Sequence, residues 1–143
     1  MTYSIRIATE RDITAMKSIR DTVRENALVS ASIEHGDYVR AITIDGRAWV
    51  CLDADEVVGF VCGRLAQRDI WALFLRASHE RRGIGNALME IVERWMFESG
   101  VSRIELTTGP GTRAERLYRR RGWITDGTTP GGDLRFVLPR PSL

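Results

Sequence analysis

Apolar residues at helical spacing predict about four helices. The first follows residues 9–12, whose residue types resemble a capping box at a helix start. The longest begins near Ile84 and ends at Gly100, since glycine is common just beyond a helix C-terminus. Two shorter helices are predicted over residues 33–44 and 112–121. The two longer helices carry apolar stripes, Ile13, Met16, Ile19 and Val23 in one and Leu88, Ile91, Val92 and Trp95 in the other.

Short apolar runs between these helices predict strands. They cover residues 4–8, 49–52, 57–65, 70–75, 103–107, 123–125 and 134–138. The second and third runs flank a polar turn and read as a hairpin. In the second half of the chain, strands alternate with helices, which predicts parallel pairing through right-handed crossovers. The pattern therefore predicts an α+β fold with a mixed, α/β-type sheet of about six or seven strands.

Composition limits the classes of function. The chain has 143 residues, 43% apolar and 28% charged, so residues 1–143 are expected to form a single domain with its own core. The net charge of +2 is too small to indicate nucleic-acid or membrane binding. The sequence shows neither a signal-peptide pattern nor an apolar stretch near the ~18 residues of a membrane span. We therefore expect a cytoplasmic protein without a nucleic-acid or membrane partner.

The two cysteines are expected to be free and buried. Cys51 and Cys62 lie in the two arms of the predicted hairpin, whose register places Cys51 opposite the neighbourhood of Val58. The two sulfur atoms would then be too far apart for a disulfide. No His or Cys pair lies near either residue, so no metal site is expected.

A basic, glycine-containing junction carries the clearest chemical signal. It joins the apolar run at residues 70–75 to the longest helix and consists of Arg81, Arg82, Gly83, Ile84, Gly85 and Asn86. A helix N-terminus presents unpaired backbone N–H groups and partial positive charge, to which the two arginines add full charges. A β-carbon at Gly83 or Gly85 would limit how closely an anion approaches the backbone. The junction therefore predicts a phosphate or diphosphate site.

Other phosphate-binding motifs do not fit this junction. A Walker loop requires Gly-Lys-Ser/Thr, and a dinucleotide fingerprint requires a third glycine, which the chain lacks here. The adjacent strand end offers no carboxylates for magnesium. A ligand held by its diphosphate without a metal remains, and coenzyme A fits this description. A second basic cluster, residues 119–121, is equally consistent with a solvated helix face.

Two segments of the chain resemble motifs of the GNAT superfamily of acyl-CoA-dependent N-acyltransferases. Residues 73–88 resemble motif A, whose pattern is Gln or Arg, two residues, Gly, one residue, then Gly or Ala. Residues 114–123 resemble motif B, with Ala, Leu, Tyr, Gly and an aromatic residue at the family's spacing. Glu80 departs from the usual Gln or Arg, and Gly111 stands where motif B often has Asn. The resemblance covers residues 57–137 well and residues 5–24 more loosely.

The resemblance implies a GNAT fold, in which the strands at 70–75 and 103–107 splay apart around the pantetheine of acetyl-CoA. Its amides would pair with the backbone near Phe74 and Leu75, where a bulge N–H would stabilise the oxyanion. The implied cofactor-binding residues are Phe74, Leu75, Arg81, Arg82, Gly83, Ile84, Gly85 and Asn86. Tyr118 would act as the general acid that protonates the leaving thiolate. No metal takes part.

The implied reaction is N-acetyl transfer to a primary amine by direct attack. The amine must first lose a proton, and Glu25 or Glu105 is the candidate base. Asp69 and Glu34 are further carboxylates by type, whereas His79 lies too near the expected phosphates and His35 is expected to face solvent. Arg24, Glu25 and Asn26 follow the first helix and suit a small polar acceptor.

Several alternatives stay open at this point. A non-catalytic acyl-CoA-binding module would share the fold and both motifs, and an enzyme with a longer acyl donor would do so too. Trp49 and Trp71 would line an acceptor site or, by their alternation with other apolar residues, belong to the core. Many family members dimerise, so a homodimer is possible, although the sequence shows no clear interface stripe.

Overall fold

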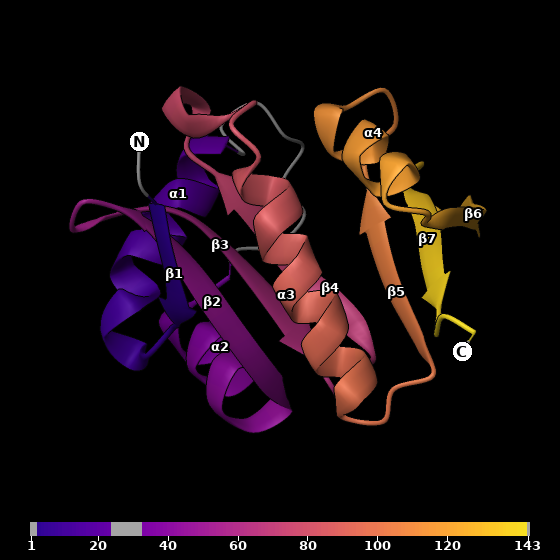
Figure 1. Cartoon of the computed structure of the whole chain (residues 1–143), viewed down its shortest axis with the longest axis horizontal. Helices are drawn as coiled ribbons and strands as arrows, with labels where there is room; N and C mark the ends of the chain where they lie inside the picture. The colour runs from indigo at the N-terminus through magenta and orange to yellow at the C-terminus, as the bar shows by residue number, and fades with distance from the viewer. Residues whose placement is uncertain (1–2, 24–32, 143) are drawn as a thin grey trace.

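A seven-stranded mixed sheet forms the centre of the described structure, with helices on both faces (Figure 1). The computed structural model describes residues 3–23 and 33–142. The strands are β1 (Tyr3–Ile7), β2 (Gly46–Asp53), β3 (Glu56–Arg64), β4 (Asp69–Leu75), β5 (Arg103–Thr108), β6 (Ile124–Thr128) and β7 (Leu134–Pro139). The α-helices are α1 (Ile13–Val23), α2 (His35–Arg40), α3 (Ile84–Glu98) and α4 (Arg113–Arg120). The predicted α+β class is confirmed.

The strand order is β1-β2-β3-β4-β5-β7-β6. Parallel pairing is confirmed only between β4 and β5, because β7 pairs antiparallel with both β5 and β6. After α4 the chain enters β6 at the sheet edge and returns as a hairpin, so β7 fills the position beside β5. The alternating pattern also implied parallel pairing for β6, the strand after α4, and this expectation was wrong.

β4 and β5 splay apart, as expected. β4 pairs with β3 along its whole length, from Asp69 to Leu75. Its pairing with β5 is confined to Asp69 opposite Glu105, next to a hydrogen bond of 2.9 Å from the Glu105 N–H to the Arg68 carbonyl. Beyond this point the two strands diverge toward their C-terminal ends (Figure 1).

Two apolar clusters fill the two faces of the sheet. One lies under α3 and α4, where Trp49 of β2 packs edge-on against Trp95 of α3, with ring centroids 5.4 Å apart. The other lies under α1 and α2 and contains Tyr38 and Phe60. Trp49 thus belongs to the core.

The cysteines follow the predicted hairpin register. Cys51 lies opposite Gly59 and Cys62 lies opposite Ala48. Both thiols are free and buried. The prediction of two unpaired, buried cysteines is confirmed.

An ion pair fixes the start of the first helical segment. Asp12 accepts a hydrogen bond of 2.8 Å from the Thr9 N–H, as the sequence predicted for this helix start. Its two carboxylate oxygens also accept hydrogen bonds of 2.8 and 2.9 Å from the Arg6 guanidinium of β1. The Arg6 hydrogen bonds hold the pKa of the Asp12 carboxyl below its ordinary value, against the opposing effect of burial.

We expect this ion pair to make stability depend on pH. A carboxyl with a lowered folded-state pKa stabilises the fold above its unfolded pKa of about 4, and this contribution is lost as pH falls through the folded-state value. Asp12→Asn should lower the free energy of unfolding by about 1 kcal/mol at neutral pH, a small value because Arg6 is half exposed. In urea unfolding at pH 7 and pH 3, the difference between wild type and variant should shrink at pH 3. A difference that persists or grows would contradict the assignment.

Candidate functional site

Within residues 3–23 and 33–142, one edge of β4 has no strand partner beyond Asp69. From Trp71 to Leu75 the strand pairs with β3 only, because β5 has already diverged. Alternate residues of a paired strand direct their N–H and C=O groups away from the partner, so those of β4 face the gap. Of the two predicted ligands of the pantetheine arm, Leu75 directs its backbone groups to the gap. The Arg76 N–H donates to the Val58 carbonyl of β3 at 2.8 Å, so by alternation the backbone groups of Phe74 face β3 as well. Such an edge can accept an extended ligand as an additional strand.

The bulge in β4 lies at Trp71. Ile70 is opposite Gly63 and Ala72 is opposite Cys62, so Trp71 is the extra residue. The family resemblance implied a bulge near Phe74 and Leu75, and that position was wrong. Those two residues pair regularly with β3. The extra residue turns Trp71 toward α2, where its ring packs edge-on against Tyr38 at 5.2 Å.

The loop before α3 has the backbone of an anion cradle. Arg81 and Gly83 have φ angles of +63° and +82°, and α3 begins at Ile84. Left-handed residues next to a helix start turn successive N–H groups toward one point. The first N–H that joins the helix ladder is that of Ala87, which donates to the Gly83 carbonyl at 3.0 Å. The N–H groups of residues 84–86 therefore have no acceptor within the helix.

The two glycines of this loop have different roles. A Cβ at Gly83 would meet no neighbouring atom, but the residue has a left-handed φ. Glycine is therefore favoured here because of the backbone conformation. A Cβ on Gly85 would lie 3.3 Å from Leu117 and 3.7 Å from Leu75. Gly85 therefore permits α3 to pack against β4 and α4. The expectation that a β-carbon there would obstruct the anion was wrong, because that position faces the protein interior.

Two of the predicted ligand side chains are held by neighbours. Arg82 donates a hydrogen bond of 2.9 Å to the Tyr3 hydroxyl of β1. Asn86 accepts a hydrogen bond of 2.5 Å from Arg121 through its side-chain oxygen. Arg81 is exposed. The loop thus presents mainly backbone groups, together with the charge of its arginines.

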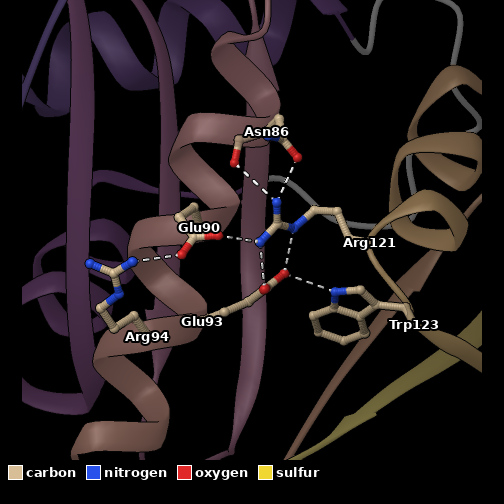
Figure 2. A network of polar contacts seen from close by, with 6 residues as sticks. All are labelled: Asn86, Glu90, Glu93, Arg94, Arg121 and Trp123. Carbon is tan, nitrogen blue, oxygen red and sulfur yellow. Dashed lines mark hydrogen bonds and ion pairs between the residues drawn. The ribbon is translucent and has the colours of Figure 1, made fainter. Parts of the chain in front are cut away.

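A buried ion-pair network joins α3 to the end of α4 (Figure 2). Arg121 donates to both oxygens of Glu93, at 2.9 and 2.7 Å, and to Glu90 at 3.2 Å. The indole N–H of Trp123 donates to Glu93 at 3.0 Å. The side chains of Arg121 and Glu93 are each only 11% exposed, although both carry charge. Together with the contact to Asn86, this network connects the predicted phosphate loop to the helix that bears the predicted acid.

Sequence reasoning missed this network. Arg121 belongs to a cluster that fitted a solvated helix face equally well, and the predicted stripe of α3 did not include Glu93. The buried residues of α3 include Leu88, Met89, Val92, Glu93 and Met96, so the stripe is rotated relative to the prediction. Glu93 lies four residues after Met89 and three before Met96, so it shares a helix face with these two apolar residues. This spacing was the signal in the sequence that Glu93 is buried.

Tyr118 lies on α4 in an apolar setting. Its ring is 6.0 Å from the rings of both Trp123 and Phe136, and the residue is 5% exposed. Burial raises the pKa of the Tyr118 hydroxyl well above its ordinary value, so the phenol keeps its proton at neutral pH. The retained proton is available for transfer, but the raised pKa makes the phenol a weaker acid. The apolar setting equally suits a core tyrosine.

The start of α4 accommodates the departure at Gly111. This residue has a φ of +72°, a conformation that glycine and asparagine adopt most readily. Its N–H donates to Glu115 at 2.7 Å, and Thr112 caps the helix by accepting from the Glu115 N–H at 3.1 Å. Gly111 therefore keeps the same turn before α4 that Asn would form at this position.

The candidate bases lie in different surroundings. Glu105 is exposed at the closed end of the gap and alternates with the buried Ile104 and Leu106. Asp69, opposite it, accepts hydrogen bonds of 2.9 and 2.6 Å from Arg64. Glu25, with the predicted acceptor residues Arg24 and Asn26, lies outside the described residues.

The remaining titratable candidates are placed away from the gap. The His79 ring lies within 2.8 Å of Asp53 on one side and within 2.8 Å of Ser78 on the other. It therefore ties the segment before the phosphate loop to the β2–β3 turn. His35 is exposed at the start of α2, as predicted, and Glu34 precedes it as the N-cap residue.

A polar cavity of about 270 Å³ opens beside the bulge, on the face covered by α2. Its wall includes Trp71 and the charged or polar residues Asp37, Arg40, Asp45, Arg64 and Gln67. Asp45 is buried and contacts Arg40 at 3.3 Å and Gln67 at 3.2 Å. Sequence reasoning did not identify this cavity, because its walls come from three separate segments.

The described residues contain neither a cluster suited to a metal ion nor a helix suited to a membrane. No group of three or more His, Cys, Asp or Glu side chains is arranged to hold a metal ion in residues 3–23 and 33–142. None of the helices in these same ranges is long and apolar enough to cross a membrane.

Solved structures with the same fold are known. The chain is similar to the PaiA N-acetyltransferase from Thermoplasma acidophilum in complex with coenzyme A, at 15% identity and a TM-score of 0.82 over 98% of this chain and 100% of that one. It is similar to Ard1 from Thermoplasma volcanium, at 19% identity and a TM-score of 0.81 over 99% and 100% of the two chains. For the ribosomal-protein-S18-alanine N-acetyltransferase from Escherichia coli, the values are 14% and 0.74 over 96% and 94%. At these identities the similarity shows the fold alone.

The sequence itself gives the family. No curated protein matches the chain. The model of the acetyltransferase (GNAT) family matches residues 14–123, which span the splayed strands, the loop at residues 81–86 and Tyr118. The protein is therefore an enzyme of the GNAT acetyltransferase family.

Proposed function

We propose that this enzyme transfers an acetyl group from acetyl-CoA to a primary amine of a small polar acceptor. The observation that carries the proposal is the free β4 edge from Trp71 to Leu75, which ends beside the backbone cradle at residues 81–86. An extended pantetheine arm fits the edge, and a diphosphate fits the cradle. The coenzyme A found with the PaiA enzyme supports this choice of donor.

The chain's own groups would have distinct roles in the reaction. The free edge of β4 near Phe74 and Leu75 would pair with the pantetheine amides, with the backbone groups of Leu75 facing the ligand. Arg81, Arg82, Gly83, Ile84, Gly85 and Asn86 would hold the diphosphate, chiefly through backbone N–H groups and positive charge. When bound, acetyl-CoA supplies a thioester carbonyl that an amine can attack directly. A backbone N–H at the Trp71 bulge would stabilise the oxyanion, a contribution of typically ~3 kcal/mol.

Proton transfer balances the reaction. The amine nitrogen forms a bond to the acetyl carbon, the C–S bond breaks, and the attacking amine loses a proton. Tyr118 would protonate the leaving thiolate, since its own proton is retained at neutral pH. Glu105 would accept the amine proton through water, with Glu25 as the alternative base. The cavity beside Trp71 lies on the face opposite α3 and would admit a small acceptor.

Binding of acetyl-CoA can be tested with two matched glycine variants. Gly83 and Gly100 flank α3 and have φ angles of +82° and +99°, with open space at both Cβ positions. Alanine at either position should cost about 1 kcal/mol of unfolding free energy. In isothermal titration, Gly83→Ala should weaken acetyl-CoA binding about tenfold or more, because the cradle distorts. Gly100→Ala should leave the dissociation constant unchanged.

Two outcomes would contradict the proposal in different ways. Absence of binding to the wild-type enzyme at millimolar acetyl-CoA would exclude the proposed donor, and equal effects of the two glycine variants would exclude the cradle. Thiol release should be followed over a panel of small polar amines. Binding without turnover on any amine, peptide or protein acceptor would favour the acyl-CoA-binding module instead.

A further inference from the structure

An exposed ion pair connects the loops that follow the two splayed strands. Glu80 lies in the loop after β4, and Arg113 is the first residue of α4, after β5. A terminal nitrogen of the Arg113 guanidinium donates to the Glu80 carboxylate. Because β4 and β5 are parallel, their C-terminal loops face each other at the same edge of the sheet. The ion pair therefore spans the end of the gap where the strands have diverged.

The charge of Glu80 is unfavourable for the proposed ligand. The residue stands three positions before Gly83, beside the cradle that would hold a diphosphate. A carboxylate at this position repels phosphate oxygens unless a cation neutralises it. Arg113 supplies that cation from the opposite side of the gap.

The ion pair is also easily broken. The side chains of Arg113 and Glu80 are 44% and 35% exposed, and exposed pairs of this kind contribute little to stability. A diphosphate carries more negative charge than one carboxylate and offers a guanidinium several acceptor oxygens. An incoming diphosphate can therefore compete with Glu80 for Arg113.

We infer that the Glu80–Arg113 ion pair is a latch across the cofactor gap, opened when the phosphates of acetyl-CoA take Arg113 from Glu80. Arg113 is then a phosphate ligand supplied by the α4 side, and Glu80 holds it in place in the free enzyme. This inference rests on the proposed acetyl-CoA site. In a latch, the charge of Glu80 lowers the affinity for coenzyme A. A Glu80 that only ordered its loop would raise this affinity instead.

The sign of the effect of Glu80→Gln tests the latch. Glu80→Gln removes the competitor for Arg113 and should tighten coenzyme A binding about fivefold, whereas Arg113→Gln should weaken it about tenfold. The probes are coenzyme A and pantetheine, which has no phosphates, each titrated calorimetrically at low and moderate salt. Pantetheine affinity should not change in either variant. Arg113→Lys should retain part of the coenzyme A affinity, because a charge without the planar fork remains.

Asp126→Asn is the matched control. It breaks the exposed pair between Arg103 and Asp126, whose side chains are 52% and 58% exposed. Coenzyme A affinity should stay unchanged in this variant. Weaker or unchanged binding in Glu80→Gln would overturn the latch, since a pair that only orders the loops predicts weakening by both single substitutions.

A structural readout separates Arg113 binding from simple charge repulsion by Glu80. The Arg113 Nε–H resonance, assigned by its loss in Arg113→Lys, should shift when coenzyme A is added and stay fixed when pantetheine is added. A resonance that coenzyme A does not move would also overturn the latch. Failure of the wild-type enzyme to bind coenzyme A would instead remove the proposed function on which the latch rests.

Discussion

Tyr118→Phe should lower the turnover number about 100-fold while the dissociation constant of acetyl-CoA stays within about twofold, as expected for the loss of a general acid. The substitution removes only the hydroxyl. The ring contacts with Trp123 and Phe136 that hold α4 on the sheet are kept. The measurement is the steady-state rate of thiol release at saturating acceptor, together with calorimetric binding of acetyl-CoA.

The pH dependence gives a second test of Tyr118. An acid must be protonated to act, and burial raises the pKa of this hydroxyl above its ordinary value near 10. The wild-type rate should therefore show no decline from Tyr118 ionisation up to about pH 10. An unchanged turnover in Tyr118→Phe, with an unchanged unfolding midpoint, would assign Tyr118 to the core and leave the thiolate to depart unprotonated.

Local patterns predicted the elements and the glycine-containing loop before α3 because each depends on neighbouring residues. Helical spacing identified α1 and α3, and glycine next to arginine at a helix start identified the cradle. The strand order depends on which hairpin arm docks beside β5, and local periodicity carries no information on that choice. For this reason the alternating pattern wrongly implied parallel pairing for β6, whereas β7 takes the position beside β5 and β6 lies at the sheet edge.

Long-range polar contacts were the main omission at the site. Arg121 meets Glu93 across 28 residues, and Arg113 meets Glu80 across 33. In the sequence each of these side chains is one charge among many on helix or loop surfaces. These four side chains differ from the other charged residues only because the fold brings α4 close to α3 and to the loop that precedes α3. The position of the bulge at Trp71 could not be predicted for the same reason. Whether a residue is unpaired depends on the register of the neighbouring strand.

Glu93→Leu should lower the free energy of unfolding by about 3 kcal/mol, at the low end for breaking a buried ion pair, because Arg121 keeps its contacts with Glu90 and Asn86. The substitution leaves the Arg121 guanidinium, 11% exposed, without its bidentate partner and the Trp123 indole N–H without its acceptor. Glu93→Gln keeps an acceptor but loses the charge, so it should cost about 1–3 kcal/mol. Urea unfolding measures both, and the milder variant remains measurable if Glu93→Leu is largely unfolded.

A variant that removes both Glu93 and Arg121 separates two free energies. One is the cost of leaving the Arg121 charge without Glu93, and the other is the stabilisation that the ion pair itself provides. Glu93→Leu combined with Arg121→Met should recover most of the loss, to within about 1–2 kcal/mol of wild type, because no buried charge remains. Asp126→Asn, which breaks an exposed pair, should change stability by no more than about 1 kcal/mol. A double variant as unstable as Glu93→Leu would mean that the network itself stabilises the fold. Since Arg121 also holds Asn86 of the proposed phosphate loop, the double variant should recover stability more fully than acetyl-CoA affinity.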